Sequence, residues 1–217
     1  MAILIGQISA ALACGNKVIV KPSEHTSILG YLVVKKFHEL GIPKDALALI
    51  LGDGSYGETL TKISPLNGVA FTGSLKTAKS IQANLLESQK QIVPLIAETG
   101  GINAMIVDSS ALLEQVTDDV IRSAFDSAGQ RCSALRVLCI QEEIYDDLVT
   151  MIKGNISTQT VGDPNDFDID IGPIINNKAL ENLNNYISKC KQKGMEVFQF
   201  EGKESKTHIN PTIVNIN

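Results

Sequence analysis

The sequence lacks clusters of basic residues, and its 217 residues carry a formal net charge of −5 at pH 7. Proteins that bind nucleic acids or anionic membranes need concentrated lysine and arginine to displace counterions, so we expect neither partner. The composition, 44% hydrophobic and 20% charged, is that of an ordinary globular protein with a substantial core.

C-x-x-C pairs are also missing, and the three histidines are scattered. We therefore expect neither a metal site nor a disulfide framework, and a reducing, cytoplasmic setting fits best. The surroundings of Cys14, Cys139 and Cys190, in an apolar helix, a strand and a second helix, predict inert thiols. Only Cys132 lies in a loop setting that suits a reactive thiol.

Long hydrophobic runs are absent too. No apolar stretch approaches the roughly 20 residues that cross a bilayer, so no transmembrane segment is expected. The apolar opening of the chain lacks a charged leader and is interrupted at Gly6, Gln7 and Ser9. It predicts a buried helix rather than a signal peptide.

What the sequence does contain is an alternation of strand and helix patterns. Strands are predicted at 18–20, 46–51, 69–71 and 92–97, and helices at 28–40, 58–63 and 74–87. This order is typical of an α/β fold with a Rossmann-type, doubly wound parallel sheet, which binds ligands at the carboxyl ends of its strands.

The pattern restarts after Glu98-Thr99-Gly100-Gly101, which we interpret as the joint between two lobes, residues 1–98 and 99–217. The second lobe is predicted to have strands at 104–107 and 135–140, and helices at 112–127, 143–156 and 177–193. A carboxylate at Glu98 suits a general base, and the glycines allow a ligand to approach the backbone.

The stretch FTGSLKTAKS, residues 71–80, nearly matches the P-loop pattern G-x-x-x-x-G-K-[ST]. Ala78 replaces the second glycine, and its Cβ obstructs the wrapping of phosphates by backbone amides. We expect a helix that begins near Ser74 and offers free backbone N–H groups to an anion. An ATP-binding module that uses Lys79 and Ser80 remains the alternative.

The segment KPSE, residues 21–24, follows the first strand and presents a cation and a carboxylate that suit ribose hydroxyls. A polar turn stopped by Pro22 explains the same residues. In the second lobe, DSAGQRCSALR places Cys132 between a helix and a strand, where backbone amides and Arg131 or Arg136 favour a nucleophilic thiolate.

Taken in order, KPSE, FTGS, ETGG and GQRCSA resemble the aldehyde dehydrogenase superfamily, and the resemblance runs from Met1 to Asn217. AETGGINAMIVDSSA and SAFDSAGQRCSALRVL are similar to the glutamate-semialdehyde dehydrogenase half of bacterial bifunctional proline-utilisation proteins. The resemblance implies an NAD-binding lobe followed by part of an α/β catalytic lobe, and a homo-oligomer for the full-length protein.

The resemblance also implies roles for individual residues. Cys132 would be the nucleophile toward a small aldehyde substrate, Glu98 the base that activates water, and Ser133 an anchor for the substrate carboxylate. NAD would be held by the remaining motif residues: Lys21, Ser23, Glu24, Gly54, Gly57, Phe71, Gly73, Ser74, Thr99 and Gly100. Glu24 would repel a 2′-phosphate and favour NAD over NADP.

Members of this superfamily are longer than 217 residues. An asparagine that donates to the oxyanion, a Glu-x-Phe-Gly segment and the substrate-gripping loop are expected outside this stretch. We therefore predict little or no activity for the isolated chain, with a noncatalytic remnant as the second alternative.

Overall fold

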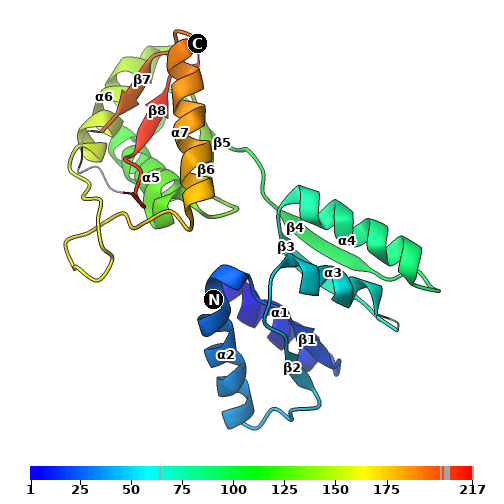
Figure 1. Cartoon of the computed structure of the whole chain (residues 1–217). Helices are drawn as coiled ribbons and strands as arrows, with labels where there is room; N and C mark the ends of the chain where they lie inside the picture. The colour runs from blue at the N-terminus through cyan, green and yellow to red at the C-terminus, as the bar shows by residue number, and fades with distance from the viewer. Residues whose placement is uncertain (64, 201, 203–205, 217) are drawn as a thin grey trace. The chain divides into compact units, whose positions relative to one another are not determined.

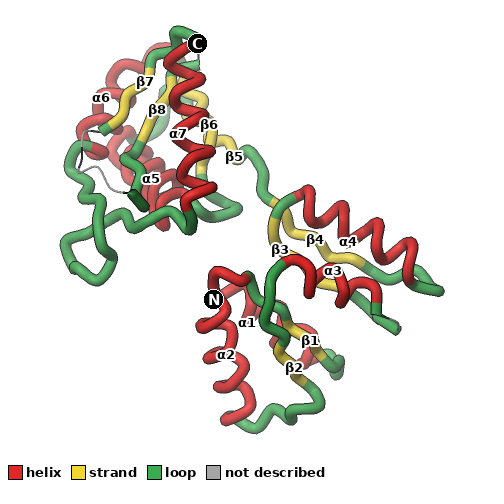
Figure 2. The backbone as a smooth tube through the Cα atoms, in the orientation of Figure 1, coloured by secondary structure: helices red, strands yellow, loops and turns green. Residues whose placement is uncertain are grey.

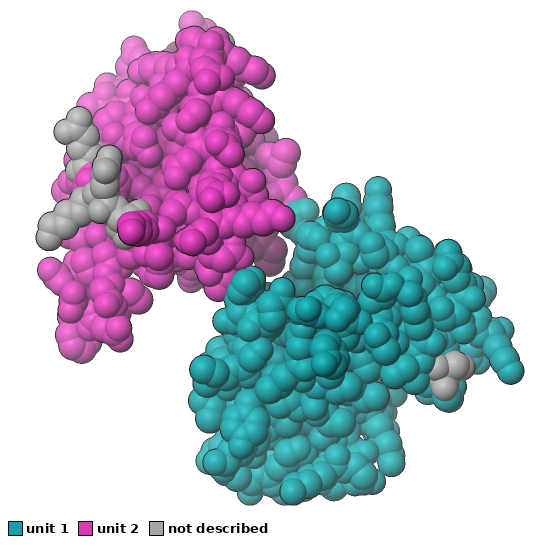
Figure 3. All heavy atoms as spheres, in the orientation of Figure 1, with its two compact units in different colours: residues 1–100 teal, residues 101–217 magenta. Residues whose placement is uncertain are grey.

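The computed structural model describes residues 1–63, 65–200, 202 and 206–216. Contacts between Cα atoms divide the chain into two compact units, Met1–Gly100 and Gly101–Asn217 (Figure 3). Asn217, where the expected second lobe ends, lies outside the described residues.

The first unit alternates helices and strands as the sequence predicts (Figure 1). Its strands hydrogen-bond in parallel pairs, β1 with β2 and β3 with β4. Its elements are α1 (Ala2–Ala13), β1 (Val18–Val20), the 3₁₀ helix η1 (Glu24–Thr26), α2 (Ser27–Glu39), β2 (Leu47–Leu49), α3 (Gly54–Lys62), β3 (Val69–Gly73), α4 (Leu75–Ser88) and β4 (Leu95–Thr99).

The second unit begins with a third parallel pair, β5 with β6. It ends with a short antiparallel pair, β7 with β8, which was not predicted from the sequence (Figure 2). Its elements are β5 (Asn103–Val107), α5 (Leu113–Phe125), η2 (Asp126–Gly129), β6 (Leu135–Ile140), η3 (Glu142–Ile144), α6 (Tyr145–Ile156), α7 (Asn177–Gln192), β7 (Val197–Gln199) and β8 (Thr212–Val214).

Each unit has a core of its own. In the first, α1, α2, β1 and β2 bury Ile8, Val20, Val34 and Leu47 together. In the second, helices α5 and α6 pack on the β5–β6 pair, and the buried cluster is Val107, Val120, Ile121, Leu135, Leu148, Ile152 and Ile156. Burial of these apolar side chains is the main favourable term in the stability of each unit.

Several predicted boundaries differ from the structure. Helix α3 begins at Gly54 instead of Glu58, because the Asp53 carboxylate accepts from the Ser55 N–H at 2.9 Å and caps it despite two glycines. Strand β4 begins after Pro94 and runs to Thr99, paired with β3 up to Gly73. The long helix predicted to end at residue 127 ends at Phe125.

The prediction that the opening helix is buried is wrong in extent. Only Ile8 of α1 is buried, whereas Met1 and Ile3 are exposed by 69% and 52%. Apolar residues lie on all sides of α1, but within the first unit only one side of the helix contacts the core. Among the described residues, no helix combines the length and apolar character needed to span a membrane.

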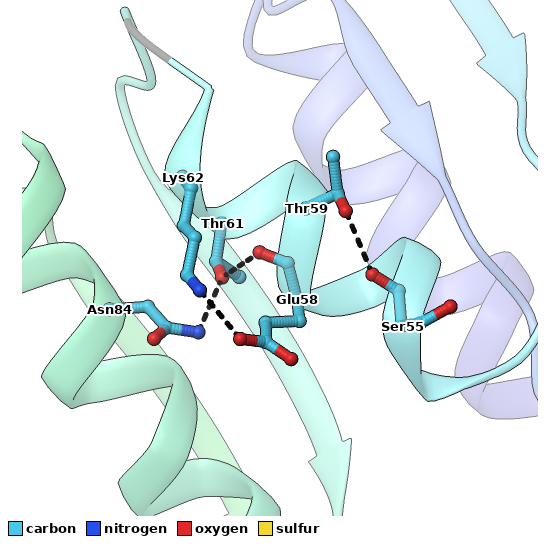
Figure 4. A network of polar contacts seen from close by, with 6 residues as sticks. All are labelled: Ser55, Glu58, Thr59, Thr61, Lys62 and Asn84. Atoms are coloured by element: carbon cyan, nitrogen blue, oxygen red, sulfur yellow. Dashed lines mark hydrogen bonds and ion pairs between the residues drawn. The ribbon is translucent and has the colours of Figure 1, made fainter.

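Helices α3 and α4 are joined by a polar network around the buried Thr61 (Figure 4). The Asn84 Nδ2 donates to the Thr61 hydroxyl at 3.1 Å, and that hydroxyl donates to the Glu58 carbonyl at 2.8 Å. Lys62 pairs with the Glu58 carboxylate one helical turn away. The network satisfies a hydroxyl whose burial without partners costs about 1–3 kcal/mol.

Leu148 gives a test of the second core. Its side chain is fully buried, so Leu148→Ala should lower the free energy of unfolding by about 2–5 kcal/mol through lost burial and a residual cavity. Chemical denaturation measures the change. Leu183→Ala, at a helix position that is 41% exposed, should cost less than half as much; equal losses would contradict the assignment of the core.

Asp53 gives a test of pH dependence. Hydrogen bonds from the Ser55 side chain and backbone hold the pKa of Asp53 below its ordinary value of 3.8. Because the pKa is lower in the folded state, the charged cap stabilises the protein above about pH 4 and is lost as the pH falls through the folded pKa. Asparagine caps equally well without titrating.

Asp53→Asn should therefore match the unaltered protein near pH 7 and lose less stability below pH 4. Thermal unfolding at pH 7 and pH 3 measures the difference. Parallel pH dependence in the two proteins would show that the Asp53 carboxylate contributes nothing.

Candidate active site

Lys21 follows β1 at the carboxyl edge of the first strand pair. Its Nζ donates to the Pro22 carbonyl at 2.9 Å and to the Gly52 carbonyl, beyond β2, at 3.0 Å. An ammonium group has three N–H donors, so one remains for a ligand. A Cβ built on Gly57 would lie 3.3 Å from the Lys21 Cε, which places α3 directly against this side chain.

Ser23 and Glu24 form the turn that follows. The Ser23 hydroxyl accepts from the His25 N–H at 3.4 Å and caps η1, and the Glu24 side chain is exposed. A shallow hollow of about 410 Å³ lies beside Glu24, lined also by His25, Thr26, Ser27, Ile28, Leu29 and Leu32. A carboxylate at the rim of a largely apolar hollow suits a sugar hydroxyl next to a flat ring.

Gly54 opens α3, but this helix start does not favour an anion. The Asp53 carboxylate already occupies it and adds negative charge. The predicted role of Gly54 and Gly57 in cofactor binding therefore rests on their lack of side chains. At this end of α3, near Lys21, a ligand can lie close to the backbone.

The start of α4 is open by contrast. Ser74 caps the helix, as predicted, with its Oγ accepting from the Thr77 N–H at 3.1 Å. The earlier N–H groups of the first turn have no partner within the helix and suit an anion. A Cβ on Gly73 would lie 2.5 Å from the Phe71 ring, so the two predicted residues contact each other and a larger residue at position 73 would have to displace the ring.

The P-loop interpretation does not match this geometry. Ala78 is buried inside α4 and its N–H donates to the Ser74 carbonyl at 3.0 Å. Lys79 is an exposed residue of the second helical turn, and the Ser80 hydroxyl donates to the Lys76 carbonyl. The backbone amides that would wrap a triphosphate are those of an ordinary helix.

Glu98 and Thr99 lie in β4, opposite Thr72 and Gly73 of β3. The strand was predicted to end at residue 97, but it continues to Thr99 because β3 offers partners up to Gly73. Parallel pairing brings Glu98, Thr99 and the start of α4 to one edge. Glu98 is exposed, and Gly100 has open space around its Cα.

Cys132 lies in the second unit, on the loop between α5 and β6, as predicted. The chain enters this loop through a left-handed turn in which Ser127, Ala128 and Gly129 have φ values of 56°, 53° and 65°. Only Gly129 adopts this conformation without cost, and a Cβ there would lie 2.7 Å from the Ala124 carbonyl oxygen. Ser127 and Ala128 each store about 1–3 kcal/mol of strain.

Side-chain hydrogen bonds hold the strained turn. The Arg136 Nη2 donates to the Gly129 carbonyl at 2.7 Å, and the Arg131 Nε donates to the Ser127 hydroxyl at 3.1 Å. Gln130 donates to the Pro173 carbonyl at 3.1 Å and accepts from the Ile175 N–H at 2.8 Å. Both arginines that we expected near the thiol thus brace its loop.

Cys132 is the second residue of a turn closed by the Ala134 N–H, which donates to the Arg131 carbonyl at 3.2 Å. The Asn103 Nδ2 donates to the carbonyls of Cys132 and Ala134, at 2.7 and 2.9 Å. The thiol and the neighbouring Ser133 side chain are exposed. A rigid loop with an outward thiol suits nucleophilic attack.

The predicted residues fall into three groups in the structure. One group lies after β1 and in the first turn of α3: Lys21, Glu24 and Gly57. A second group shares the β3–β4 edge: Phe71, Gly73, Ser74, Glu98 and Thr99. Cys132 and Ser133 belong to the second unit, so the expected pair of Cys132 and Glu98 is divided between the units. No cluster of potential metal ligands occurs among the described residues.

Exposure does not single out Cys132. Cys14 and Cys139 are exposed too, whereas Cys190 is buried, and the expectation that these three thiols are inert stays a prediction. Sequence reasoning also missed Asn103, Gln130 and Gly52. The polar type of Asn103, two residues after ETGG, was the available signal for one of them, but their partners lie 29 to 45 residues away.

The Aldehyde dehydrogenase family model matches residues 1–216. A bifunctional protein PutA of Klebsiella aerogenes is 45% identical, over 100% of this chain and 18% of that protein. A 1-pyrroline-5-carboxylate dehydrogenase of Oceanobacillus iheyensis is 33% identical, over 98% of this chain and 42% of that enzyme. The chain thus spans less than a fifth of the PutA relative and about two fifths of the dehydrogenase.

Solved structures agree. A crystal structure of bifunctional proline utilization A (PutA) matches with a TM-score of 0.94 and 46% identity, over 98% of this chain and 22% of that chain. A lactaldehyde dehydrogenase structure matches with a TM-score of 0.89 and 29% identity, over 95% and 44%. The expected α/β fold is confirmed, and the chain belongs to the aldehyde dehydrogenase family.

Proposed function

We propose that this chain carries the NAD-binding and nucleophile segments of an enzyme that oxidises L-glutamate γ-semialdehyde to glutamate in proline catabolism. The observation that carries the proposal is the exposed Cys132 thiol on a loop braced from three directions. The similarity to PutA and 1-pyrroline-5-carboxylate dehydrogenases supports the substrate.

The first unit fits NAD. The remaining N–H of Lys21 and the exposed Glu24 carboxylate would hold the adenine ribose, with Ser23 beside them. The start of α4 at Ser74 would receive the pyrophosphate, and Phe71, Gly73, Thr99 and Gly100 would lie along the cofactor. When bound, NAD would supply the acceptor for the hydride.

Cys132 would act first. Its thiolate adds to the aldehyde carbon, forming a C–S bond and a thiohemiacetal oxyanion. The Cys132 N–H forms no hydrogen bond among the described residues, because the turn is closed by Ala134 instead, and it is suited to donate to that oxyanion. Ser133 would hold the substrate carboxylate beside the thiol.

Glu98 would act after the substrate carbon has lost its hydride and become a thioester. The carboxylate takes a proton from water, whose oxygen attacks the thioester carbon. The C–S bond then breaks, the Cys132 thiolate is regenerated and glutamate leaves. The exposure of Glu98 at the end of a strand supports contact with water.

Four free cysteines support a reducing, cytoplasmic setting.

The roles of Cys132 and Glu98 can be separated kinetically in the intact protein. Cys132→Ser should abolish NADH formation from glutamate semialdehyde. Glu98→Gln should give a burst of about one NADH per site and then turnover slowed by about 100- to 10,000-fold, because the thioester accumulates. Stopped-flow absorbance of NADH measures both.

Cys139→Ser is the matched control, since this thiol is also exposed and lies on β6 of the same unit. It should leave turnover unchanged. Normal NADH formation by Cys132→Ser would refute the assignment of the nucleophile, and a burst-free Glu98→Gln profile would refute that of the base.

Glu24 should set the choice of cofactor. Removing its charge in Glu24→Gln relieves repulsion of a 2′-phosphate, which is worth about 1 kcal/mol or more at an exposed site, so the NADP to NAD ratio of kcat/KM should rise roughly tenfold. Glu39→Gln removes an exposed carboxylate of α2 that pairs with Lys36 and should leave the ratio unchanged. Equal ratios for all three proteins would dismiss this role.

A further inference from the structure

We infer that Asn103 is a positioning residue that fixes the direction of the Cys132 thiol and of the Cys132 N–H. The inference rests on the proposed function, in which Cys132 is the nucleophile. The family resemblance implied no role for Asn103. The inference follows from the hydrogen bonds between the Asn103 side chain and the loop that carries Cys132.

A single amide group holds two points of the loop. The Nδ2 of Asn103 donates one N–H to the Cys132 carbonyl at 2.7 Å and the other to the Ala134 carbonyl at 2.9 Å. An amide nitrogen has two donors in one plane, so both are used. The peptide groups that follow Cys132 and Ala134 are therefore fixed relative to β5.

The peptide group before Cys132 is held as well. The Arg136 Nη2 lies 3.5 Å from the Arg131 carbonyl, at the limit of a hydrogen bond, and bonds the Gly129 carbonyl more closely. The orientation of the peptide groups before and after a residue defines its φ and ψ. The Ala134 N–H donates to the same Arg131 carbonyl at 3.2 Å. The 2.7 Å bond from Asn103 is thus the shortest restraint on the two peptide groups that flank Cys132, and we expect it to set the direction of the Cα–Cβ bond of this residue.

A shift in strand register brings both side chains to this loop. Asn103 pairs with Leu135, but Ala104 pairs with Val137, so Arg136 is an extra residue on β6. Such bulges redirect side chains and are frequent near active sites. The Asn103 Oδ1 faces the linker, since a Cβ on Gly101 would lie 3.9 Å from it. The Asn103 side chain thus lies between Gly101, the last residue of ETGG, and the loop that carries Cys132.

The test is a pair of substitutions in the intact protein. Asn103→Asp keeps the shape and replaces the amide donor with an acceptor that repels both carbonyls, and Asn103→Ala removes the group without adding charge. Each should lower kcat by about 10- to 100-fold, the loss expected when a reacting group is misplaced by about 1 Å. NAD affinity, measured by calorimetry, should not change.

A second measurement separates positioning from general stability. The pH profile for alkylation of Cys132 by iodoacetamide, followed by mass spectrometry, should shift in both variants. Asn84→Asp is the matched control, because it removes an amide donor to the Thr61 hydroxyl between α3 and α4. It should leave kcat and the alkylation profile unchanged.

Two outcomes would overturn the inference: a kcat within twofold of the unaltered protein in both Asn103 variants, or an unchanged alkylation profile in both. If the unaltered protein fails to oxidise glutamate semialdehyde, the proposed function fails. The alkylation profiles still decide whether Asn103 orients the thiol.

Discussion

The candidate sites of the first unit depend on parallel strand pairing. In a parallel pair both strands end at the same edge, so residues that follow different strands meet there. Lys21 after β1 reaches the Gly52 carbonyl after β2, and Glu98 in β4 lies opposite Thr72, two residues before the cap of α4. Burial of Val20 and Leu47 holds β1 and β2 in the α1–α2 core and thereby positions the polar residues at their ends.

The second unit uses a different device. The loop that carries Cys132, residues 126–134, belongs to none of the strand pairs of the described residues, and three of its residues have left-handed backbone conformations. Such a turn persists only where surrounding contacts determine it. Asn103, Gln130 and Arg136 supply those contacts from β5, the loop and β6, and the buried Ala134 and Leu135 anchor the start of β6 in the core.

Local sequence signals predicted much of this structure. Period-two and helical patterns located the strands and helices, and Ser74 capped α4 where its side chain suggested. Boundaries that depend on a partner strand were missed. The residues near Glu98 carry no signal that β3 extends to Gly73. Among the described residues, the short strands β7 and β8 pair with each other, and a connection of 12 residues separates them in the sequence. The glycines of α3 concealed the first turn of this helix, which Asp53 caps.

Site residues divide in the same way. Cys132, Glu98 and KPSE were predicted as site residues because their types and order suit a recognisable chemistry, and their roles stay predictions. Asn103 and Gln130 were missed because their importance lies in backbone carbonyls and amides 29 to 45 residues away, whose positions only the fold determines. Residue types in a sequence therefore suggest candidates for groups that react, whereas candidates for groups that orient them come from the fold.

Orientation also explains why one cysteine among three exposed ones is suited to catalysis. The Cys139 backbone is part of β6, where its own amide and carbonyl belong to the strand pair. Cys14 ends a helix, and its N–H donates to the Ala10 carbonyl at 3.3 Å. Among the cysteines, only Cys132 combines exposure with a backbone N–H that donates to no group of the described residues, so in the proposed mechanism the same residue would attack a carbonyl and donate to the oxyanion that forms.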